Sequence, residues 1–69
     1  MVSKTLTKEE GGTVESFRFE PSRKQVARSV TIDVIVENKV DGEVVTRRHY
    51  SLDGASALQT RLQSVGFKA

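Results

Sequence analysis

The chain has 69 residues, of which 36% are hydrophobic and 29% are charged, and its formal net charge is +2. Val, Ile, Leu and Phe together make up 19 of these residues, which exceeds the roughly 20% share below which chains tend to be disordered. One small folded domain is therefore expected, near the size at which a single core barely offsets chain entropy. The absence of cysteine excludes disulfides and thiolate metal sites.

The distribution of apolar residues also bears on location. No apolar run approaches the ~18 residues of a membrane span, and no hydrophobic signal-peptide region follows Met1. We therefore expect a soluble, cytoplasmic protein that has no membrane partner. The charge balance of eleven Lys and Arg against nine Asp and Glu is too even to indicate a strongly basic surface.

The first twelve residues carry almost no periodic apolar signal. Thr7 to Glu10 matches a helix capping box, but no apolar run follows it, so there is no helix for it to cap. Residues 1–12 are accordingly predicted to be a flexible N-terminal tail, and residues 13–69 a single small domain.

A half-buried strand is predicted from Thr13 to Glu20, because Phe17 and Phe19 alternate with polar residues. Pro21 is expected to end it, since proline cannot donate a hydrogen bond to a sheet. The polar and basic segment from Pro21 to Ser29 is predicted to be a loop or a single helical turn.

The clearest strand is predicted from Val30 to Val40, where β-branched residues alternate with polar ones. Asp41-Gly42 then indicates a hairpin, and Glu43 to Leu52 forms the returning strand. A two-residue turn would put Tyr50 and Leu52 on the face opposite to Val34 and Val36. A three-residue loop with a bulge at Gly42 pairs Lys39 with Glu43 and places all four on one face, so the hydrophobic pattern favours this bulged register. Val30 and Ile32 share this inward face and are expected to belong to the core.

The last segment is predicted to be a helix. Ser51 or Asp53 can cap its N-terminus, and Gly66 followed by Phe67 is typical of a helix C-terminus. Its apolar stripe consists of Ala55, Leu58, Leu62 and Val65. The predicted fold class is α+β: a three-stranded antiparallel sheet with one C-terminal helix packed on one face.

Signals for catalysis are weak. His49 is the only histidine, and in the chosen register it lies opposite Asp33 with Ser51 two residues further on. On a flat exposed sheet these three residues would have no oxyanion hole and no protection from water, so we expect a cross-strand ion pair instead. The glycine pair Gly11-Gly12 lacks the spacing of a phosphate-binding loop. We expect no enzyme, no cofactor, no metal and no small-molecule substrate.

Basic residues suggest one binding function. Arg23, Lys24 and Arg28 follow the first predicted strand, and Arg48 lies on the third. Arg47 is expected to be diagonal to Asp33 and Glu37, which would largely balance its charge. The predicted plan resembles small three-stranded DNA-binding domains such as integrase arm-binding domains. That resemblance is one of architecture, because the chain lacks tryptophan and the arginine motifs of such families, and it implies nucleic-acid binding as an alternative function.

A second group of residues suggests protein binding. Ile35 and Val45 are predicted to be diagonal neighbours on the exposed sheet face, beside Arg47 and His49, and the sheet has two open edges. The preferred prediction is a small non-enzymatic binding protein, such as a regulatory or accessory subunit. It would dock onto another protein or a second copy of itself through this face or an edge strand.

Overall fold

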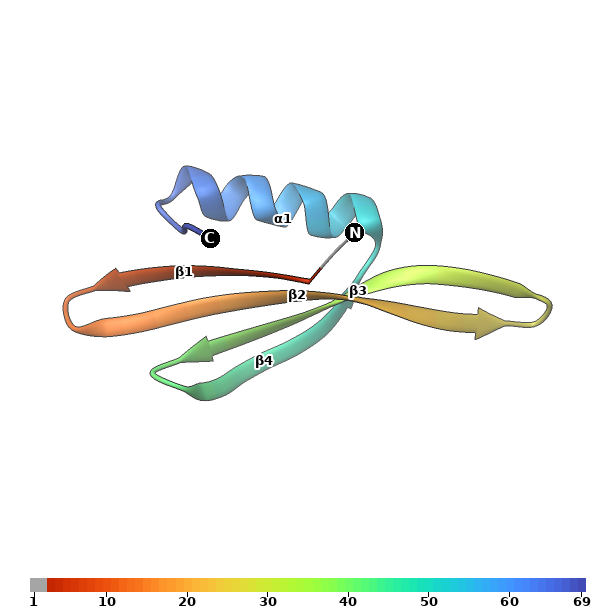
Figure 1. Ribbon diagram of the computed structural model, residues 1–69, viewed down its shortest axis with the longest axis horizontal. Coiled ribbons are helices and arrows are strands. Elements are labelled where there is room, and N and C mark those ends of the chain that lie inside the picture. The colour runs from red at the N-terminus through yellow and green to blue at the C-terminus, as the bar shows by residue number, and fades with distance from the viewer. Residues whose placement is uncertain (1–2) are drawn as a thin grey trace.

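The computed structural model describes residues 3–69, with the backbone alone at positions 24 and 26. It confirms the α+β class, and it shows four strands in an antiparallel sheet of order β1-β2-β3-β4, followed by one C-terminal helix (Figure 1). The helix packs against β3 and β4. The elements are β1 (Lys4–Glu10), β2 (Thr13–Val26), β3 (Ser29–Val40), β4 (Glu43–Tyr50) and α1 (Leu52–Ser64).

Strand β1 occupies most of the segment that was predicted to be a flexible tail, so that prediction is wrong for residues 4–10. Leu6 is completely buried and pairs with Phe17 of β2. Thr7 exchanges two backbone hydrogen bonds with Lys68, at 2.7 and 2.9 Å. One well-placed leucine and a ladder of backbone hydrogen bonds therefore order a segment that has little apolar periodicity. Residues 1–2 of the predicted tail lie outside the described residues.

The predicted loop after Pro21 is also wrong, because β2 continues to Val26 and β3 already begins at Ser29. Pro21 pairs with Val34 of β3, whereas β1 begins only opposite Phe19. Among residues 3–69, strand β2 therefore has a neighbouring strand at Pro21 on one side alone. Proline is tolerated at such an edge position, since its missing N–H can face away from the partner strand.

The hairpin between β3 and β4 has a two-residue turn instead of the predicted three-residue loop. Asp41 and Gly42 both have positive φ, at 50° and 84°, and Val40 pairs with Glu43. This backbone is that of a type I′ turn, whose twist matches that of the flanking strands. The predicted Lys39–Glu43 register is therefore wrong.

A bulge does occur, but it lies further from the turn, between Asn38 and Lys39. Val45 is the extra residue, because Thr46 pairs with Asn38 and Val44 pairs with Lys39. The bulge shifts the pairing by one residue and so returns Tyr50 to the same face as Val34. The predicted shared face of Val34, Val36 and Tyr50 is therefore confirmed even though the predicted turn is not.

The core lies between α1 and one face of the sheet. Ser51 caps the helix, with its Oγ accepting a hydrogen bond from the Gly54 N–H at 3.1 Å. At the other end, Gly66 has φ 104° and the Phe67 N–H donates to the Leu62 carbonyl, as expected from the sequence. The buried hydrophobic residues among those described are Leu6, Phe19, Val34, Val36, Ala55, Leu62 and Phe67.

Two residues that were predicted to face inward do not belong to this core. Val65 is the C-cap of α1 and is mostly exposed, because the chain leaves the helix at this residue. Leu52 begins the helix instead of ending a strand, and it is also exposed. The buried stripe of α1 is therefore shorter than the sequence pattern indicates.

The burial of Leu6 allows a direct test of β1. Leu6→Ala is expected to lower the free energy of unfolding by about 2–5 kcal/mol, because it removes a fully buried leucine from the core. Urea denaturation of the full chain would measure this loss. Thr5→Ala, at an exposed position of the same strand, is the matched control. Equal stability of the two variants would contradict the packing of β1.

The β3–β4 turn gives a second test. Gly42→Val is expected to cost roughly 1–3 kcal/mol, because a β-branched residue is strained at positive φ. No neighbouring atom lies within 4 Å of a Cβ placed there, so the penalty comes from the backbone conformation and not from a steric clash. Gly42→Asn should therefore lose much less in thermal denaturation, since asparagine tolerates this conformation. Similar losses for Val and Asn would contradict the turn geometry.

Candidate functional site

The predicted docking residues lie on the sheet face away from the helix, but they do not form one patch. Ile35 pairs with Glu20 on one side and with His49 on the other, and Arg47 pairs with Glu37. Val45 lies at the bulge, near the other end of β4, so it is not the diagonal neighbour of Ile35 that the sequence suggested. The apolar pair on which that prediction rested is therefore not brought together.

Charged side chains surround Ile35 on this face. Ile35 is half-buried and lines a depression of about 90 Å³ together with Arg18, Glu20, Glu37 and Arg47. Arg18 forms an ion pair with Glu20 at 3.3 Å. The face is consequently balanced in charge, and its apolar centre is small.

His49 lies beside Asp33 but has no catalytic partner in Ser51. The His49 Nδ1 is 2.8 Å from one carboxylate oxygen of Asp33, although the two residues are diagonal to each other, because His49 pairs with Ile35. The Ser51 hydroxyl instead caps α1. Within residues 3–69, no three His, Asp or Glu side chains are grouped closely enough to hold a metal ion.

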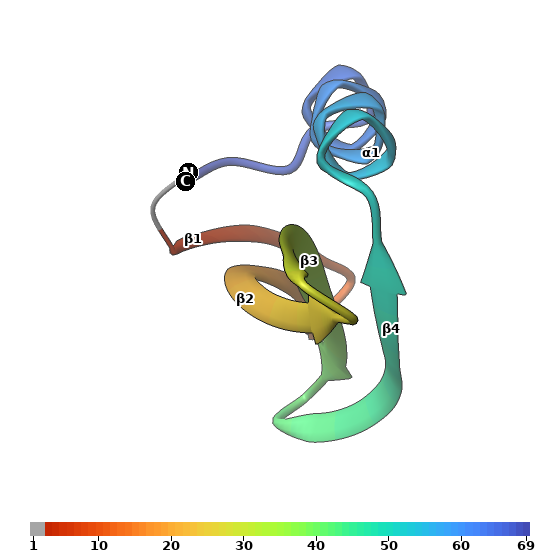
Figure 2. The ribbon, with the colours of Figure 1, turned by 90° about the vertical axis from the view of Figure 1, so that its right-hand side faces the viewer.

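The most distinctive feature of the molecule is a two-stranded arm. Strand β4 ends opposite Val34 and β1 begins opposite Phe19, so within the described part of the chain the β2–β3 hairpin continues alone beyond these positions. We call residues 23–32 the arm. Figure 1 shows the arm extending away from the rest of the molecule, which we call the body. The whole molecule, arm included, is 48 Å long. Figure 1 also shows that α1 does not extend over the arm, and Figure 2, viewed from the arm's end, shows α1 on one side of the sheet.

The arm differs from the body in charge. It contains Arg23, Lys24 and Arg28 and no acidic residue, whereas the rest of the chain has eight basic and nine acidic residues. Arg23 and Arg28 are exposed, and Arg28 lies in the two-residue turn at the tip. Ala27, the other turn residue, has φ 55°, a conformation that costs an L-residue roughly 1–2 kcal/mol. Three of the four predicted nucleic-acid residues therefore lie on one projection.

Two residues of the arm were predicted to be part of the core. Val30 and Ile32 share a face with Val34, as expected, but they are 61% and 50% exposed. A helix of 13 residues is only about 20 Å long at 1.5 Å per residue, whereas the 12-residue β3 extends over roughly 40 Å. This difference in length, which is visible in the sequence, is the signal that could have identified the arm.

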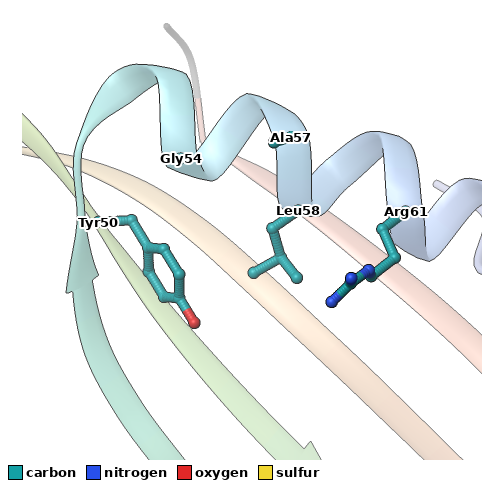
Figure 3. Close-up of a pocket in the computed structure, with 5 residues that line it drawn as sticks. All are labelled: Tyr50, Gly54, Ala57, Leu58 and Arg61. Carbon is teal, nitrogen blue, oxygen red and sulfur yellow. The ribbon is translucent and has the colours of Figure 1, made fainter.

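A groove between β4 and α1 was not predicted. It has a volume of about 450 Å³ and is lined by Tyr50, Gly54, Ala57, Leu58 and Arg61. Figure 3 shows the side chains of Tyr50 and Arg61 extending beneath the helix on either side of Leu58. Arg48 lies on the same face of β4 as Tyr50, opposite Val36, so it belongs to this side of the body and not to the arm.

Similarity to other proteins does not narrow these alternatives. Within residues 3–69, no helix has both the length and the hydropathy that a membrane span requires. No family model matches the chain, and no curated protein and no solved structure matches it either.

Proposed function

We propose that the chain is a non-enzymatic binding module whose arm contacts duplex DNA. The observation that carries this proposal is the separation of charge: the arm is basic and free of acidic residues, while the body has nearly equal numbers of both signs. Phosphates attract such a projection through release of their bound counterions. Asp33, the carboxylate that borders the arm, pairs with Ser22 at its base, lies 2.8 Å from His49 and is five residues from Arg28 at the tip.

The shape of the arm supports this choice. The major groove of B-DNA, about 12 Å wide and 8.5 Å deep, admits a two-stranded β-ribbon. The arm has four residue pairs, from Arg23–Ile32 to Val26–Ser29, and at about 3.4 Å per residue it is roughly 14 Å long. It is therefore long enough to reach the floor of the groove. Val30 and Ile32 would offer apolar contacts to thymine methyl groups there.

The aromatic residues favour a duplex over single-stranded nucleic acid. Proteins that bind single strands stack bases on exposed aromatic side chains. The aromatic residues of this chain are Phe17, Phe19, Tyr50 and Phe67, all of them in the body and buried or half-buried. The arm therefore has basic residues for phosphates but no surface on which a base would stack.

Docking of another protein through Ile35, Val45, Arg47 and His49 stays a prediction. The geometry favours it less than DNA binding by the arm, because Ile35 lies among charged side chains and Val45 is remote from it. Arg48 is not included in the DNA-binding set, since it lies on the helix side of the body. An edge strand offers a better protein contact, because its backbone groups can pair with another extended segment.

The test is the salt dependence of binding to a fluorescein-labelled 20-base-pair duplex, measured by anisotropy between about 50 and 200 mM KCl. The double change Arg23→Ala with Lys24→Ala is expected to reduce the slope of log K against log salt by about two, near one for each lost phosphate contact. The effect should be similar for duplexes of different sequence, because phosphate contacts carry no base information.

The matched control removes two basic residues of the body, Arg18→Ala with Lys39→Ala. Both form ion pairs with neighbouring glutamates, at 3.3 and 3.5 Å, so their loss should change the slope little. Equal effects of the two double variants, or no measurable duplex binding by the unaltered chain, would refute the proposal for the arm.

A further inference from the structure

The two edges of the sheet are treated differently. The outer edge of β1 is covered at Thr7, where the C-terminal segment exchanges two backbone hydrogen bonds through Lys68. Strand β4 forms the other edge, and no strand among residues 3–69 pairs with its outer side. An exposed edge strand presents N–H and C=O groups to which another extended segment can bind. The bulge at Val45 disturbs the start of β4, but Thr46 to Tyr50 pair regularly with β3.

The residues that line the groove next to this edge suit the binding of a side chain from such a segment. Gly54, Ala57, Leu58 and Arg61 are spaced as one stripe of a helix, and the two smallest of them leave the space beside the Tyr50 ring open (Figure 3). Apolar surface is supplied by Leu58 and Tyr50. The charged residue that lines the groove is Arg61, and no carboxylate lines it.

We propose that β4 and this groove bind an extended acidic peptide, which adds to the sheet as a fifth strand. In this mode, backbone hydrogen bonds give affinity, and pockets for alternate side chains give specificity. One apolar side chain of the peptide would occupy the groove beside Leu58 and Tyr50, and a carboxylate would lie near Arg61. Arg48, two residues before Tyr50 on the same face of β4, would favour a second carboxylate.

The arginines of β4 also argue against a second copy of this chain as the occupant. If two β4 strands paired antiparallel about the centre of the regular segment, Arg48 would lie opposite Arg48 of the other copy. Like charges placed directly opposite each other are destabilising across a strand pair. An acidic segment instead places unlike charges there, so charge complementarity favours it. This site is separate from the arm and does not depend on the proposed DNA binding.

The probes are two labelled synthetic peptides of nine residues. In the first, glutamate alternates with valine around a central leucine. In the second, lysine replaces every glutamate. Anisotropy with the full chain is expected to show binding of the glutamate peptide at least about tenfold tighter than the lysine peptide. Hydrogen exchange should then show slower exchange of the backbone amides of β4, because a new strand accepts their hydrogen bonds.

Two variants test the groove itself. Ala57→Phe is expected to weaken the glutamate peptide about tenfold by filling the space, whereas Ser56→Phe adds the same bulk outside the lining and should not. Arg61→Glu should reverse the preference between the two peptides. Arg23→Glu, on the arm, should leave it unchanged.

Several results would overturn the inference. These are no binding of either peptide, equal effects of Ala57→Phe and Ser56→Phe, or protection of arm amides instead of β4 amides. Slower β4 exchange that grows with protein concentration and needs no peptide would assign the edge to a second copy, and this too would refute it. Absence of duplex binding by the unaltered chain would refute the proposed function but leave this site standing.

Discussion

The short helix is the constraint on which the rest of the structure depends. At 13 residues, α1 covers about 20 Å of sheet, whereas β2 alone has 14 residues and extends over more than twice that length. The residues opposite α1 form a small core in which Phe19 and Val34 are completely buried. Beyond that core, the same hairpin continues without cover from the helix, and its described side chains, at positions 23, 25 and 27–32, are exposed. The arm is thus a direct consequence of the difference in length between the helix and the strands.

The two ends of the chain show how such a small core is closed. Leu6 of β1 and Phe67 after α1 are far apart in sequence, but both are buried in the same cluster. Phe67 also makes an edge-on contact with Phe17, with the ring centres 5.3 Å apart. The C-terminal segment therefore adds apolar cover over β1 and β2 and hydrogen bonds at the β1 edge. This segment lies at β1, the edge of the sheet opposite to β4, so among residues 3–69 β4 keeps a free edge next to the groove.

The fold could be predicted from the sequence where the signal is local. The caps of α1 at Ser51 and Gly66 are single-residue signals, and both predictions are confirmed. The shared face of Val34 and Tyr50 was predicted from the alternation of apolar residues along the two strands. The bulge at Val45 keeps both residues on that face, although the turn differs from the predicted one. Strand β1 could not be predicted in this way, because its stability comes from pairing with β2 and from Leu6 alone. The prediction that Pro21 ends the strand is wrong for a related reason, because whether a proline ends a strand depends on whether that strand has a second neighbouring strand.

The candidate sites were less predictable, since they depend on which segments are left uncovered. The basic residues Arg23, Lys24 and Arg28 were identified from sequence, but their placement on a projection required the length of β2 and β3. The groove at Arg61 required the position of α1 relative to β4, for which no sequence pattern gives a signal. Val30 and Ile32 show the limit most clearly, because their alternation is that of core residues and only the absence of a covering helix exposes them.

The arrangement of charge links the two proposed sites to the stability of the body. Ion pairs on the outer sheet face, such as Arg18–Glu20, balance the body locally, so that its net field at the arm is weak. Residues 23–32 contain no acid, so the charge of Arg28 at the tip of the arm is available to a polyanion. On the helix side, Arg48 and Arg61 lie where no carboxylate lines the groove. Each proposed ligand is therefore anionic, but the two sites differ in shape. The arm is a projecting ribbon that suits a groove in its partner. The groove beside the β4 edge is open and suits an extended segment.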